Sequence, residues 1–134
     1  MIAENTTRQD ELVRILNLLA SSLSEVYWVA LVDHEGLVLA CVPPNPEVNP
    51  ESIAAMTAVL TTTGERILGE IEGGQLRYTS VVGSKRHHVA VMLPEGRLLT
   101  LGLPPDISPQ KTFQPIRDWI PELLKVLQMR FTKS

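Results

Sequence analysis

The sequence contains a single cysteine, Cys41, among its 134 residues. One thiol cannot form an intrachain disulfide or supply the cysteine cluster of a structural zinc site. Its apolar runs are too short to cross a bilayer, and the N-terminal residues lack the basic stretch and apolar core of a secretory leader. We therefore expect a cytoplasmic protein with no metal and no other cofactor.

Basic residues are also too few for a nucleic-acid-binding protein. Twelve Lys and Arg stand against fifteen Asp and Glu, which gives a formal net charge of −3. Phosphate backbones are bound by clustered Lys and Arg, and the longest basic run here is Lys85 and Arg86 in an expected turn. No Gly-rich phosphate loop followed by a lysine occurs, so the chain is not expected to hydrolyse a nucleotide itself.

The composition is that of an ordinary globular domain. Hydrophobic residues make up 44% of the chain and charged residues 20%. A chain of this length suits one hydrophobic core, so we expect residues 1–134 to form a single domain.

Residues 26–41 predict a hairpin that is buried on both faces. Two apolar runs, YWVALV and LVLAC, show no alternation of polar and apolar residues, which is typical of strands covered on both sides. Between them, the Asp33 side chain can bond the backbone two residues on, and Gly36 accepts the positive φ of a bulged turn. The sequence therefore indicates a sheet sandwiched between helices.

Two helices are predicted on either side of this hairpin. The first spans about residues 7–23, and Thr6 with Gln9 could form its capping box. Its apolar stripe is Leu12, Ile15, Leu16, Leu19 and Leu23. After a Pro-rich loop, the second helix begins with Asn49 as N-cap and Pro50 as the first helical residue.

Three further strands are expected over residues 75–82, 86–93 and 98–103, followed by a last helix. The apolar stripe of that helix is Phe113, Ile116, Ile120, Leu123, Leu124, Leu127 and Phe131. Pro121 falls inside it, so a kink or a break is expected near Asp118. The fold class is an α/β protein of the α+β sandwich type, with a five-stranded antiparallel sheet between helices in the order helix-strand-strand-helix-strand-strand-strand-helix.

The strand over residues 75–82 carries polar side chains on both faces, which indicates the edge of a sheet. No proline blocks this edge, so it can pair with a second copy across a two-fold axis. We therefore expect a homodimer. The expected interface residues are Gln75, Leu76, Arg77, Tyr78, Thr79, Ser80 and Val81.

The second helix has two unlike sides. One side repeats apolar residues at helical period: Ile53, Met56, Leu60, Gly64, Ile67 and Ile71. The opposite side is almost free of charge in its first half, through Ala55, Ala58, Val59 and Thr62. An uncharged exposed face of this kind indicates contact with another protein.

Three segments carry a resemblance to a known family. They are ALVDHEGLVLA at residues 30–40, AAMTAVLTTTGERILGEI at residues 54–71 and RLLTLGL at residues 97–103. Together with the order of the elements, they make nearly the whole chain similar to the Roadblock/dynein light chain family.

The resemblance implies a non-enzymatic homodimer with a joined ten-stranded sheet, which binds small Ras-like GTPases or serves as a light chain of larger assemblies. Bacterial relatives of the gliding-motility MglB type act as GTPase-activating proteins, and the resemblance implies that they reshape the GTPase's own catalytic groups without supplying an arginine. The candidate partner surface here is the uncharged face of the second helix, with Glu65 and Arg66 beyond it. Plain dimer packing is the alternative use of that face.

Two other classes of function use residues that the chain also contains. Cys41, Asp33 and the pair His87 and His88 have the residue types of a nucleophile, an orienting acid and a base. Adjacent histidines in a strand point to opposite faces, and no nucleophile elbow surrounds the cysteine, so catalysis is not expected. The remaining alternative is a scaffold, or a sensor that binds a small ligand between sheet and helices. The apolar residues expected beneath the helices favour a filled core over such a cavity.

Overall fold

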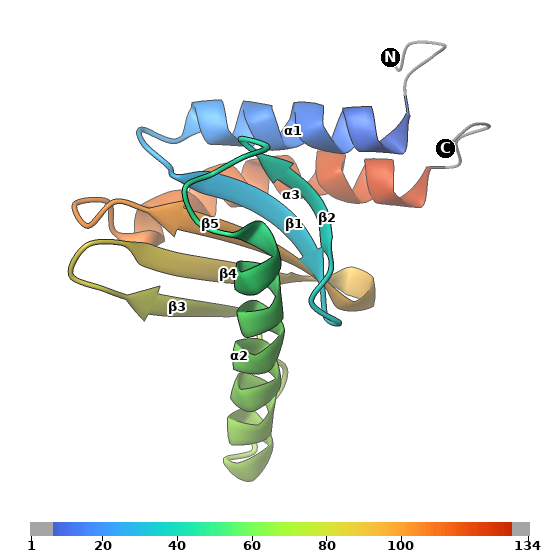
Figure 1. The fold of residues 1–134 in the computed structure, drawn as a ribbon. Coiled ribbons are helices and arrows are strands. Elements are labelled where there is room, and N and C mark those ends of the chain that lie inside the picture. The colour runs from blue at the N-terminus through green and yellow to red at the C-terminus, as the bar shows by residue number, and fades with distance from the viewer. Residues whose placement is uncertain (1–6, 130–134) are drawn as a thin grey trace.

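The structure is a computed structural model and describes residues 7–129 (Figure 1). Its helices and strands are α1 (Arg8–Ser22), β1 (Trp28–Asp33), β2 (Val38–Val42), α2 (Pro50–Glu70), β3 (Tyr78–Val82), β4 (His87–Leu93), β5 (Arg97–Leu103) and α3 (Phe113–Gln128). The strands form one antiparallel sheet in the order β2-β1-β5-β4-β3. The predicted fold class and element order are confirmed, and β3 is an edge strand as expected.

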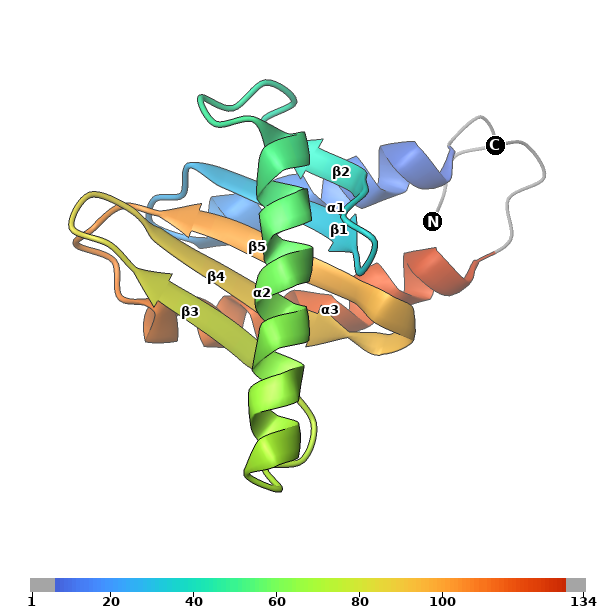
Figure 2. The same ribbon diagram turned by 60° about the horizontal axis from the view of Figure 1, so that its bottom comes forward.

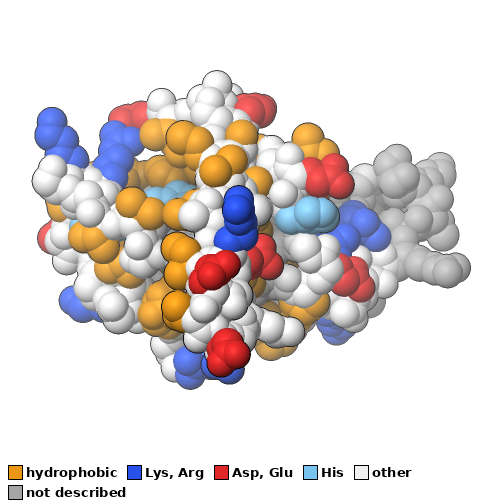
Figure 3. Space-filling view, turned by 90° about the horizontal axis from the view of Figure 1, so that it is seen from below, with side chains coloured by type: hydrophobic (Ala, Val, Ile, Leu, Met, Phe, Trp, Pro, Cys, Tyr) orange, Lys and Arg blue, Asp and Glu red, His pale blue; other side chains and the backbone are white. Residues whose placement is uncertain are grey.

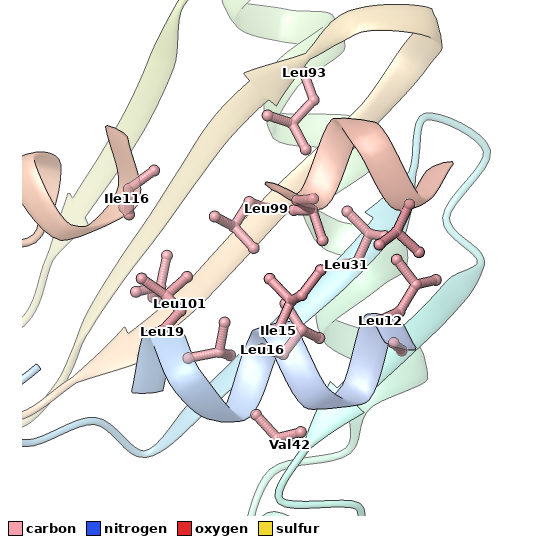
Figure 4. Close-up of a cluster of buried hydrophobic side chains, with 14 of the residues drawn as sticks. Leu12, Ile15, Leu16, Leu19, Leu31, Val42, Leu93, Leu99, Leu101 and Ile116 are labelled. Atoms are coloured by element: carbon pink, nitrogen blue, oxygen red, sulfur yellow. The ribbon is translucent and has the colours of Figure 1, made fainter. Parts of the chain in front are cut away.

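The sheet separates two unequal layers. The helices α1 and α3 lie side by side on one face, and α2 crosses the other face alone (Figures 1 and 2). The main core fills the space between the sheet and the α1/α3 pair (Figure 4). Its fully buried members include Ile15, Leu16, Leu31, Leu99 and Leu101. Burial of this many large aliphatic side chains is the main stabilising contribution on that face.

The predicted β1–β2 hairpin is confirmed in detail. The Asp33 carboxylate accepts hydrogen bonds from the backbone N–H groups of Glu35, at 2.9 Å, and Leu37, at 3.0 Å. Gly36 has a φ of 89°, which side-chain-bearing residues rarely adopt. The pairing register shifts between Leu31 and Val32, as a bulged hairpin requires.

The helix α2 contacts the sheet mainly through small residues and not through the whole apolar stripe noted in its sequence. One cross-strand row on this face contains only small side chains: Cys41, Ala30, Thr100, Ala90 and Thr79. The buried residues of α2 are also small: Ala54, Thr57 and Thr61. The helix therefore packs close to the sheet through small residues, while Met56 and Ile67 of the predicted apolar stripe stay 60% and 56% exposed.

The start of α1 lies one residue later than predicted. Thr6 lies outside the described residues, and the capping box forms between Thr7 and Asp10. The Asp10 N–H donates to Thr7 Oγ1 at 3.1 Å, and the Thr7 N–H donates to Asp10 Oδ2 at 3.2 Å. An aspartate at this position thus serves in place of the expected glutamine.

A kink or a break was expected near Asp118, and the break is wrong. The helix α3 is continuous from Phe113 to Gln128 with Pro121 inside it. Pro121 is exposed while Leu123 and Leu127 are buried, so packing of the apolar stripe holds the helix together across the lost backbone bond. The last member of that stripe, Phe131, lies outside the described residues.

The strand β3 is shorter than predicted, because it begins at Tyr78 and not at Gln75. Leu76 turns toward α2 and packs over Gly64, where a Cβ atom would lie 3.3 Å from Leu76 Cδ1. Within residues 7–129, no helix has the length and apolar character needed to cross a membrane.

A larger side chain at the helix–sheet contact should destabilise the fold. We expect Ala54→Leu to lower the free energy of unfolding by about 1–3 kcal/mol, because Ala54 is 0% exposed and faces the row of small residues. Urea denaturation followed by circular dichroism measures this. The neighbouring Ala55→Leu, at an exposed position, should change the free energy of unfolding little. Equal losses of stability in both variants would show that α2 does not pack on the sheet through Ala54.

Candidate functional site

The outer edge of β3 presents unpaired backbone groups. Gly83 N–H donates to Arg86 O, and Met92 N–H donates to Arg77 O, which fixes the hydrogen-bonding pairs between β3 and β4. Because such pairs alternate along an antiparallel ladder, the N–H and C=O groups of Thr79 and Val81 point toward β4. Those of Tyr78, Ser80 and Val82 point outward. These three residues can therefore accept a further strand.

Large apolar side chains are exposed around this edge. On the described surface they include Tyr78, Val81 and Val82 of β3, Met56 and Ile67 of α2, and Ile71 directly after that helix, each between 47% and 67% exposed. In Figure 3 hydrophobic side chains gather on the left of the view, the side on which β3 lies in Figure 1. An exposed patch of this extent marks an interaction surface.

The two sides of α2 face different parts of the molecule. Met56 and Leu60 lie on the side toward β3, since they line one cavity together with Val81. The other side lies toward the β1–β2 hairpin, because a Cβ at Gly36 would lie 3.2 Å from Ala55 Cα. The predicted partner residues Ala55, Val59, Thr62, Glu65 and Arg66 are exposed, and Ala58 is half-buried.

A cavity of about 360 Å³ lies between α2 and the sheet at the β3 end. Its lining residues are Trp28, Ile53, Met56, Thr57, Leu60, Val81, Gly83, Arg86, His87 and His88. The indole of Trp28 lies over Gly102, where a Cβ would come within 1.9 Å of the ring. The filled core expected beneath the helices is present beneath α1 and α3 and, as a smaller cluster, beneath α2, but the expectation of no cavity is wrong at the β3 end of the α2 face.

The two adjacent histidines lie on opposite faces of β4, as predicted. His87 accepts a hydrogen bond from Gly83 N–H at Nδ1, and its Nε2–H donates to Pro105 O at 3.1 Å. His88 faces α2: because the Thr57 hydroxyl donates to Ile53 O, it accepts from His88 Nε2–H at 3.0 Å. Burial lowers the pKa of His88 below its usual 6.5. Both rings thus have structural partners.

The candidate catalytic residues do not come together. Cys41 lies on β2 and the histidines on β4, with β1 and β5 between them. The Cys41 thiol donates to Pro43 O at 3.4 Å, and burial, with a smaller effect of Glu51, raises its pKa. A protonated thiol is a poor nucleophile. Among residues 7–129, no three His, Cys, Asp or Glu side chains are placed to hold a metal ion.

Comparison with known proteins adds a family match and three likenesses of structure. The sequence profile of the Roadblock/LC7 domain matches residues 12–102. MglB of Myxococcus xanthus aligns with a TM-score of 0.80 and 16% identity over 99% of this chain and 98% of that chain. An MglB in a tetrameric arrangement aligns with a TM-score of 0.79 and 14% identity over 94% and 93% of the two chains. The gliding protein MglB from Thermus thermophilus aligns with a TM-score of 0.77 and 14% identity over 94% of each. No curated protein matches the chain in sequence.

Acidification should destabilise the protein through His88. Its folded-state pKa is lowered, so as the pH falls through the unfolded value the unfolded chain binds a proton that the folded chain does not. We expect the free energy of unfolding to fall between neutral pH and about pH 5, and to fall less in His88→Gln. The exposed His34 supplies the control, since the free energy of unfolding of His34→Gln should depend on pH as that of the parent protein does. If the free energy of unfolding of His88→Gln depended on pH as strongly as that of the parent protein, burial of His88 would not be the cause of the acid destabilisation.

Proposed function

The chain belongs to the Roadblock/LC7 domain family, as its sequence predicted, and from this membership we propose that it is a homodimeric regulator of a small Ras-like GTPase. Members of the family are generally non-catalytic regulatory or adaptor proteins. The proposed activity is that of a GTPase-activating protein of the MglB type. Its strongest support is the exposed apolar surface shared by β3 and α2.

The unpaired edge of β3 supports the dimer. The outward N–H and C=O groups of Tyr78, Ser80 and Val82 match those of a second copy when β3 runs antiparallel to itself about a two-fold axis at Ser80. Such pairing would join two five-stranded sheets into one. It would also satisfy the backbone groups that an exposed edge leaves open.

The position of α2 supports the same two-fold axis. Its C-terminal half projects beyond the β3 edge of the sheet (Figures 1 and 2). It carries the exposed Ile67, and the exposed Ile71 follows its last residue. The two-fold axis at Ser80 would place this end of the helix over the sheet of the second protomer. There it would lie beside Val81 of that protomer, where the 360 Å³ cavity opens. We therefore assign the cavity to apolar side chains of the partner's helix in preference to a small ligand.

The GTPase surface would then be the side of α2 that faces away from β3. This side offers Ala55, Ala58, Val59 and Thr62, with Glu65 and Arg66 beyond. Small side chains allow a partner's backbone to approach closely, and few charges need to be desolvated. Arg86 donates to Glu47 at 2.6 Å and lies 4.6 Å from the centre of the Tyr27 ring, which argues against its use as an arginine finger.

Two alternatives make different use of the same surfaces. A scaffold or light chain would form the dimer and hold a larger assembly without accelerating GTP hydrolysis. A sensor would fill the cavity beside Trp28 with a small ligand and need no GTPase. The apolar residues at its mouth, Met56 and Val81, continue into the exposed patch of the β3 edge, which favours a protein as the occupant.

Proline at the outward position of β3 should separate the protomers. We expect Ser80→Pro to yield monomers, because it removes an outward N–H and leaves the β3–β4 ladder intact. Sizing with multi-angle light scattering measures this, and circular dichroism checks the fold. Thr79→Pro would instead remove an inward bond to β4 and should lower stability as well. A folded Ser80→Pro dimer would place the interface elsewhere.

A charge on the uncharged side of α2 should weaken GTPase binding. We expect Thr62→Glu to reduce the affinity for the Ras-like GTPase by roughly tenfold or more, since the carboxylate would be desolvated in the interface. Fluorescence anisotropy with a labelled GTPase measures the affinity. Thr63→Glu is the matched control, because this adjacent exposed residue points about 100° away around the helix. Equal affinities in Thr62→Glu and the parent protein would reject this surface.

A further inference from the structure

A second groove lies on the opposite face of the sheet from α2. It has a volume of about 280 Å³ and runs between β3 and the first half of α3. Its lining residues are Arg77, Tyr78, Val91, Phe113, Ile116, Arg117 and Ile120. The rings of Tyr78 and Phe113 pack at 4.7 Å with planes inclined by 58°. The groove thus has an aromatic and aliphatic floor.

Two arginines flank this floor without a partner of opposite charge. Arg8, Arg14, Arg86 and Arg97 each donate a hydrogen bond to a carboxylate or a carbonyl. Within residues 7–129, Arg77 and Arg117 make no side-chain hydrogen bond and no ion pair. No acidic side chain among those residues lines the groove, so both positive charges remain available to a partner.

The helix α3 adds to the positive potential. Its N-terminal turn lies at the groove, where Phe113 is its first residue. That turn contains no acidic residue, and no side chain caps it. The positive end of the helix dipole therefore acts in the same direction as the two guanidinium groups.

We propose that this groove binds an acidic peptide segment of a partner protein. Its carboxylates pair with Arg77 and Arg117, and an aliphatic or aromatic side chain of the segment covers Tyr78 and Phe113. Arg binds carboxylates in a planar, bidentate geometry, and apolar contact between two such pairs gives the segment a defined register. The site is independent of the GTPase surface, which lies on the other face of the sheet.

The same features favour a peptide over other anionic partners. A membrane surface or a nucleic-acid strand is bound through a larger cluster of basic residues than the two present here. A groove lined by apolar side chains and two arginines matches a short segment that carries both carboxylates and an apolar side chain.

The test uses a labelled acetylated peptide of alternating glutamate and leucine, with fluorescence anisotropy as the readout. The full-length protein should bind it saturably, and a peptide with lysine in place of glutamate should not bind. Arg77→Glu and Arg117→Glu should each weaken binding by about tenfold. Lys125→Glu is the matched control, because Lys125 is an exposed basic residue in the last turn of α3, outside the groove, and the change should leave binding unchanged.

A charge exchange makes the result decisive. The double variant Arg77→Glu with Arg117→Glu should bind the lysine peptide and lose the glutamate peptide. Absence of saturable binding by the parent protein would overturn the proposal, as would equal losses in Lys125→Glu and the groove variants. No GTPase is present in this assay, so its outcome does not depend on the GTPase function, and sizing of the same samples reports the dimer separately.

Discussion

The close packing of α2 against a row of small side chains is the contact on which the rest of the structure depends. Ala54 packs in one cluster with Ala30, and the Thr57 hydroxyl accepts a hydrogen bond from His88 on β4. Because both surfaces are small, one helix can lie near the sheet without a thick layer of large side chains between them. The apolar residues Met56 and Ile67 of α2 are then left exposed on its flank, while Ile53 still packs against the core on this face.

This arrangement separates a stable core from surfaces for partners. The α1/α3 layer buries the large aliphatic residues and supports the sheet, while the α2 layer is thin and open at the β3 edge. The exposed flank of α2 and the unpaired edge of β3 adjoin each other, so one partner can cover both. The residue types that could do chemistry are instead held in structural hydrogen bonds, as His87 and His88 are. This organisation supports the proposed function, in which the molecule contacts other proteins.

The sequence predicted best where local chemistry decides the structure. Asp33 and Gly36 specify their turn through hydrogen bonds and φ values that involve only neighbouring residues. The contact of α2 with the sheet could not be predicted, because the row of small residues on the sheet comes from five strands and depends on their register. The cavity beside Trp28 was missed for the same reason, since Gly102 and His88 meet it only across strands. The polar pattern of residues 75–82 did identify the edge strand, but its first residue depends on the packing of Leu76 over Gly64.

The most direct test of the proposed function is binding to the Ras-like GTPase encoded by the same genome. The GTPase is loaded with GDP or with a GTP analogue for affinity measurements, and with GTP for phosphate release. The account predicts tighter binding to the GTP-analogue form and faster phosphate release when the dimer is added. Absence of binding in both nucleotide states would contradict it.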